Sequence, residues 1–254
     1  MMRTANPALN DDVFIKARRL SRADGQSMTI SGTVNKSAIL LVLLFLAAVF
    51  SWDRSFQPAG FGVEKIFTPT PLLWVGLIGG LIIALVTIFK RTWSPVTSPV
   101  YAIFEGLFLG AVSAGFEAGF PGIVLQAVLG TFGTLFALLM AYRSGLIKAT
   151  ENFKLGVAAA TGGIFFIYLI SMVLGFFQMN VPFIHESGII GIGFSLFVVI
   201  IAALNLVLDF DFIENGEKMG APKYMEWYAA FGLLVTLVWL YLEMLRLLAK
   251  LRDR

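Results

Sequence analysis

The chain has 254 residues, of which 58% are hydrophobic and 14% charged, whereas about a quarter of an ordinary soluble domain is charged. It contains no cysteine, which excludes disulfides and thiolate metal sites, and its single histidine, His185, argues against a zinc site or a Ser-His-Asp relay. The net charge is +3, but most of the charged residues lie in tails and loops. This distribution is explained by membrane topology rather than by nucleic-acid binding. The composition predicts an integral membrane protein that is not an enzyme and holds no cofactor.

Residues 1–36 are expected to form a polar and basic cytosolic tail, with a short helix at about residues 12–20. The tail lacks the apolar core of a signal peptide, so we expect it to be retained. A basic cluster in it favours modest binding to anionic lipid; it consists of Lys16, Arg18, Arg19 and Arg22.

Seven continuously apolar runs follow the tail, separated by Pro, Gly and charged residues. About twenty helical residues cross a hydrocarbon core of ~30 Å, and most of the runs reach this length. They lack the period-two alternation of barrel strands. We therefore predict an all-α fold, a seven-transmembrane-helix bundle over residues 37–252. The predicted spans are 37–52, 72–89, 100–119, 122–142, 156–177, 188–208 and 227–249.

The distribution of basic residues predicts the orientation of this bundle. With seven spans, the tail and the loops after spans two, four and six share one side and hold most of the 19 Lys and Arg residues. This places the N-terminus in the cytosol. The basic residues of the C-terminal end would then lie outside, so a six-span or re-entrant alternative stays open.

The third span carries small residues at four-residue spacing, which allow two membrane helices to approach closely. These residues are Ala102, Gly106, Gly110 and Ala114. Helix packing is the expected role of this stripe.

Acids at membrane depth are costly and need a partner, water or a function. Glu105, in the third span, is interpreted either as a functional acid or as one neutralised by Lys90 and Arg91 at the end of span two. Asp209 lies four residues after Asn205, so the two share a helix face and Asp209 is the better candidate for an inward-facing acid.

Three further acids lie near the membrane surfaces. Asp211 does not share a face with Asp209 and is expected to be solvated or interfacial. Glu243 could form an i,i+3 pair with Arg246, or it could serve a function. Glu226 begins the last span beside aromatic residues and is expected to anchor it at the interface.

Several acids thus gather around the predicted cytosolic mouth, opposite Lys90 and Arg91. Carboxylate oxygens are natural ligands of calcium, and close carboxylates share protons, which would couple cation passage to pH. A basic residue could close the mouth by ion pairing. This hypothesis does not require an enzyme.

Four segments resemble the Bax inhibitor-1 (transmembrane Bax-inhibitor-motif) family, in particular its bacterial branch with an extended N-terminal tail. They are SPVYAIFEGLFLG (98–110), LDFDFIE (208–214), GAPK (220–223) and LYLEMLRLL (240–248). The resemblance implies seven helices with the seventh central, location in the bacterial plasma membrane and a pH-sensitive calcium leak.

The resemblance also implies residue roles. Asp209 and Glu243 correspond to a pair of acids that gate the leak and could ligate calcium, and Lys90 or Arg91 corresponds to a basic latch. The chain departs from the family pattern in two ways. Glu243 stands where the family usually has Asp, and the segment between the two acids is about ten residues longer, which adds ~15 Å of helix.

The leading interpretation is a passive, pH-sensitive calcium leak, with the bilayer, calcium ions and protons as partners. The alternative is a non-transporting regulator that binds other membrane proteins, for instance in protease quality control or in stress and cell-death pathways. An intramembrane aspartyl protease is disfavoured because no Gly-x-Gly-Asp motif occurs, and a retinal pigment because the last span has no central lysine.

Overall fold

The structure is a computed structural model that describes residues 27–57, 66–68, 70–177 and 188–253. Seven helices of this part are long and apolar enough to cross a membrane, which confirms the predicted seven-helix membrane fold. The last helix, which was expected to be central, has the largest buried share of the seven, at 56% of its most apolar stretch. The helix expected at 12–20 and His185 lie outside the described residues.

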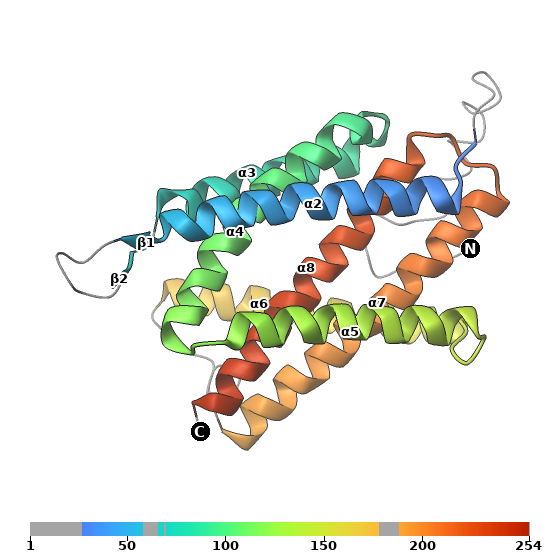
Figure 1. The fold of residues 1–254 in the computed structure, drawn as a ribbon. Coiled ribbons are helices and arrows are strands. Elements are labelled where there is room, and N and C mark those ends of the chain that lie inside the picture. Colours follow the sequence, from blue (N-terminus) through green and yellow to red (C-terminus); the bar gives the residue numbers. More distant parts are fainter. Residues whose placement is uncertain (1–26, 58–65, 69, 178–187, 254) are drawn as a thin grey trace. The chain divides into compact units, whose positions relative to one another are not determined.

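Figure 1 labels the helices and strands and colours them along the sequence from blue to red. They are α2 (Ile30–Arg54), β1 (Phe56–Gln57), β2 (Ile66–Phe67), α3 (Pro71–Phe89), the 3-10 turn η1 (Arg91–Trp93), α4 (Ser94–Gly119), α5 (Ile123–Arg143), α6 (Glu151–Phe176), α7 (Ile189–Lys218) and α8 (Met225–Arg252). The two short strands pair antiparallel after α2, with Phe56 opposite Phe67.

Several helices extend beyond the apolar runs that predicted them. α2 begins at Ile30 rather than 37, because Thr29 caps it by accepting a hydrogen bond from the Gly32 N–H at 3.0 Å. α6 begins after the cap residue Thr150 rather than at 156. α7 runs ten residues past the predicted end at 208 and stops before Gly220, whose φ of 64° continues no right-handed helix.

The chain falls into two compact units, each described by itself. Unit 1 holds α5 from Leu125, α6, α7 as far as Phe212, and α8 from Val235 onward. Unit 2 holds α2 to α4 with the strands, together with the segment Ile213–Leu234, which contains the α7–α8 connection.

In unit 2, α4 packs along both α2 and α3 (Figure 1). The small-residue stripe faces α2: a Cβ added at Gly106 would overlap the Leu44 carbonyl, and one at Gly110 would overlap the Ala48 backbone. Ala102 and Ala114 are fully buried. Main chain therefore approaches main chain between α2 and α4, as small residues permit.

In unit 1, α6, α7 and α8 share an apolar core. Ile164, Val198 and Ile201 are buried together, and Trp239 of α8 packs against them. α5 joins this unit through the Met244 side chain, which would contact a Cβ built on Gly130 at 3.2 Å. The same packing brings polar side chains of α6 against those of α7 and α8.

Candidate functional site

The predicted site residues divide between the two units. Asp209, Asp211 and Glu243 belong to unit 1, whereas Glu105, Lys90 and Arg91 belong to unit 2. The role of Lys90 or Arg91 as a latch for the acids Asp209 and Glu243 therefore stays a prediction.

The Glu243 carboxylate is buried, with 1% of the side chain exposed, and is held by two partners. The Tyr168 hydroxyl of α6 donates to its two oxygens at 3.0 and 3.1 Å. Arg246 pairs with Oε1 at 2.6 Å, and its guanidinium lies 5.4 Å from the centre of the Tyr168 ring. The i,i+3 pair that the sequence left open is thus formed, and it balances the buried charge.

Asp209 lies on the protein-facing side of α7. It is 1% exposed, and Asn205, four residues earlier, is 3% exposed. The Asn205 amide donates to the Thr161 hydroxyl of α6 at 2.9 Å and to the Ile201 carbonyl at 2.8 Å. The Asn205 face of α7 therefore turns toward α6, and Asp209 is buried in protein as an inward-facing acid would be.

Asp209 and Glu243 lie at different distances from the connected ends of α7 and α8. Asp209 precedes the last residue of α7, Lys218, by nine positions, and Glu243 follows the first residue of α8, Met225, by eighteen. At 1.5 Å per residue the acids lie ~14 and ~27 Å from these helix ends. Because consecutive spans cross the membrane in opposite directions, this difference favours two separate acidic sites over a directly coordinating pair.

Asp211 is paired rather than solvated. Lys154, in the first turn of α6, lies 2.8 Å from Oδ2 of Asp211 and 3.5 Å from Oε1 of Glu151. The Lys154 side chain is only 4% exposed and that of Asp211 18%. This contact was not predicted from the sequence, because Lys154 falls between the predicted spans 122–142 and 156–177. No helical spacing relates Lys154 to Asp211.

Glu105 lies at the contact between α3 and α4. A Cβ added at Gly80 of α3 would lie 3.1 Å from Glu105 Oε2, so the glycine leaves room for the acid. The hydrogen-bond partner of Glu105 is the buried Tyr101, which lies one turn earlier in α4. Of its expected basic neighbours, Arg91 instead places its guanidinium 5.7 Å from the centre of the Tyr228 ring, and Lys90 is exposed.

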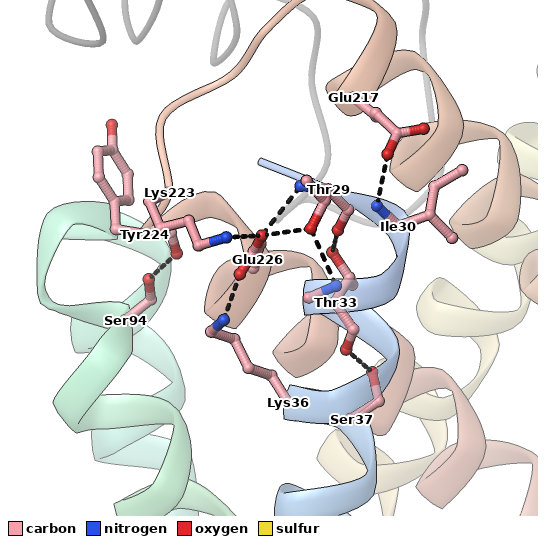
Figure 2. Close-up of polar contacts among 11 residues, drawn as sticks. Thr29, Ile30, Thr33, Lys36, Ser37, Ser94, Glu217, Lys223, Tyr224 and Glu226 are labelled. Carbon is pink, nitrogen blue, oxygen red and sulfur yellow. Dashed lines mark hydrogen bonds and ion pairs between the residues drawn. The ribbon is translucent and has the colours of Figure 1, made fainter. Parts of the chain in front are cut away.

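The most extensively bonded acid is one that the sequence placed at the membrane interface. Glu226, in the first turn of α8, is fully buried. Its Oε1 accepts from the Thr29 N–H and hydroxyl at 2.9 Å each, Lys223 lies 2.8 Å from it, and Lys36 pairs with Oε2 (Figure 2). We call Glu226, Thr29, Lys36 and Lys223 the Glu226 cluster. It joins the start of α2 to the start of α8.

Further contacts support the Glu226 cluster. The exposed Glu217 accepts from the Ile30 N–H at 2.9 Å (Figure 2). The Met28 N–H donates to the Ala221 carbonyl at 2.6 Å. The Tyr224 phenol is neutral at neutral pH, and burial raises its pKa further above the ordinary value, although Arg91 opposes the shift.

Within the residues that the structure describes, no group of three or more His, Asp or Glu side chains is arranged to hold a metal ion.

The family profile described as "Bax inhibitor 1 like" matches residues 6–253, nearly the whole chain. The chain belongs to the Bax inhibitor 1-like family. The resemblance seen in its sequence segments is thereby confirmed. Comparison with curated proteins gave no match. Membership in the Bax inhibitor 1-like family and the seven apolar helices together identify an integral membrane protein.

Proposed function

We propose that this protein is a passive cation leak pathway that prefers calcium and responds to pH. The observation that supports it most is the burial of Asp209 and Glu243, each 1% exposed, inside helices that are long and apolar enough to span a membrane. Ionisable residues at membrane depth are costly and commonly mark ion or proton pathways.

Asp209 is the acid proposed to contact the permeating cation. A carboxylate offers hard oxygen ligands to calcium and loses its charge on protonation, so one group can attract the ion and sense pH. Neighbouring polar groups, the Asn205 amide and the Thr161 hydroxyl, line the same α6–α7 contact. Their dipoles would partly replace the hydration shell of the ion.

Glu243 is proposed to act as a second, separate acid. Its negative charge is balanced by Arg246 and its oxygens are bonded by Tyr168. Arg246 is half exposed, so its pair with Glu243 can open toward water. We propose that the Glu243 site contributes to the pH response rather than ligating calcium together with Asp209.

The setting proposed for this activity is the bacterial plasma membrane with the N-terminus in the cytosol. Its partners are the lipid bilayer, calcium ions and protons, with other membrane proteins as further candidates. We propose no nucleic-acid partner, no resident cofactor and no catalysed covalent reaction. The chemistry required is binding and release of ions by carboxylates.

The test compares calcium uptake into liposomes that hold purified wild type, Asp209→Asn or Asp53→Asn. Asp53 is an exposed acid near the end of α2, so its substitution makes the same chemical change outside the proposed pathway. We expect uptake to change in Asp209→Asn and to stay at the wild-type level in Asp53→Asn. Uptake no greater than that of empty liposomes, from folded wild type, would favour the non-transporting regulator.

A further inference from the structure

Lys154 is an unusual residue for its position. It lies in the first turn of α6, and its side chain is only 4% exposed. Lysine is almost never buried to this extent unless it is paired, and an ionisable residue inside a membrane-spanning helix points to a function. Neither the family profile nor the sequence pattern assigns it one.

The partner that accounts for this burial is Asp211 of α7. The Lys154 ammonium lies 2.8 Å from its carboxylate. Glu151 is 3.5 Å away, but it is 64% exposed and on the same helix, so it contributes little. The Lys154–Asp211 pair therefore joins α6 to α7 in a mostly buried contact, where removing one charge of a pair is costly.

Asp211 is rigidly connected to the acid of the proposed pathway. Asp209 and Asp211 lie two residues apart in the continuous helix α7. A bond that holds Asp211 therefore also fixes the position of Asp209. Asn205 is bonded to Thr161 of α6 at 2.9 Å, so α6 holds this part of α7 at two levels.

We propose that Lys154 is a positioning residue that holds the segment Asp209–Asp211 of α7 against α6 in the non-conducting arrangement. This inference rests on the proposed leak function. It assigns to α6 the restraining role that the family resemblance implies for Lys90 or Arg91. Loss of the pair frees the segment and increases cation flux.

The experiment measures calcium uptake into liposomes at one fixed pH for wild type, Lys154→Gln, Asp211→Asn and Lys154→Arg. Lys148→Gln is the matched control, since this exposed lysine lies in the connection that directly precedes α6. We expect uptake about fivefold or more above wild type in Lys154→Gln and Asp211→Asn, the usual size of a coupling between two sites. Lys154→Arg and the control should stay near wild type.

Two double variants separate release of a restraint from damage to the fold. The charge exchange of Lys154→Glu with Asp211→Lys should return uptake toward wild type, because the pair is restored in reverse. In Lys154→Gln combined with Asp209→Asn, the increase should disappear, because the released pathway still depends on Asp209. Unfolding midpoints and gel-filtration profiles identify variants that are folded.

The outcomes distinguish this inference from the proposed function. If Asp209→Asn alters wild-type uptake while folded Lys154→Gln matches wild type, the inference is overturned and the leak stands. An increase that persists in Lys154→Gln combined with Asp209→Asn also overturns it. Uptake that is absent from wild type and from every variant contradicts both.

Discussion

Glu226→Gln is expected to destabilise the protein by removing one charge from a fully buried site without changing its size. The substitution leaves Lys36 and Lys223 facing a neutral amide and replaces two charge-assisted bonds from Thr29 by weaker ones. Lys36 is only 17% exposed, whereas Lys223, at 45%, can turn to water. The main loss therefore comes from Lys36 and Thr29.

The magnitude follows from these contacts. Removing one partner of a buried pair costs about 3–5 kcal/mol, and the partial exposure of the lysines places Glu226→Gln near the lower end, at about 3 kcal/mol. For a chain of this size that corresponds to a fall of about 10 °C in the unfolding midpoint. Hydrogen exchange at the first turn of α2 should increase, because the Thr29 N–H loses its charged acceptor.

The assay is thermal unfolding of the purified protein in detergent, combined with hydrogen exchange. Glu217→Gln is the control, because Glu217 is exposed and its side chain makes one hydrogen bond within the described residues, from the Ile30 N–H, worth about 1 kcal/mol. If Glu226→Gln unfolded at the same temperature as Glu217→Gln, with unchanged exchange in α2, the reasoning about the Glu226 cluster would be refuted.

Three more predictions use the same unfolding assay. Gly32→Ala should lower the unfolding midpoint although alanine favours helices, because the added Cβ would overlap the Glu226 carboxylate. Gly133→Ala is the control: a Cβ there meets open space, so the substitution should be neutral or stabilising. A lower midpoint in Gly133→Ala than in Gly32→Ala would contradict the structure. Gly106→Ala should lower the midpoint by separating α4 from α2, and an unchanged midpoint would argue against their close contact. Tyr168→Phe should cost about 1–3 kcal/mol by removing a donor from a buried carboxylate, and wild-type stability would contradict that bond.

The number and type of the helices could be predicted because the bilayer requires long apolar stretches. Their ends could not be predicted from hydropathy. The polar residues before position 37 belong to α2 because Thr29 caps the helix and because Lys36 pairs with Glu226, which lies 190 positions later in the chain. α7 likewise continues through polar residues to Lys218. Local caps, the turn at Gly220 and tertiary partners, rather than apolar content, set these boundaries.

The candidate site was predictable only where its contacts are local. The pair of Glu243 with Arg246 follows from i,i+3 spacing, and the burial of Asp209 from its shared face with Asn205. The contact of Lys154 with Asp211 joins two residues far apart in sequence, on successive helices, and nothing near either residue signals it. The same holds for the bonds that reach Glu243 from Tyr168.

The measurement that tests the central claim most directly is calcium uptake by wild-type liposomes at about pH 6 and about pH 8, with empty liposomes as the reference. We predict uptake above the reference that differs between the two pH values, because buried carboxylates attract the ion and bind protons. Uptake equal to that of empty liposomes at both pH values, from protein shown to be folded, would contradict the account.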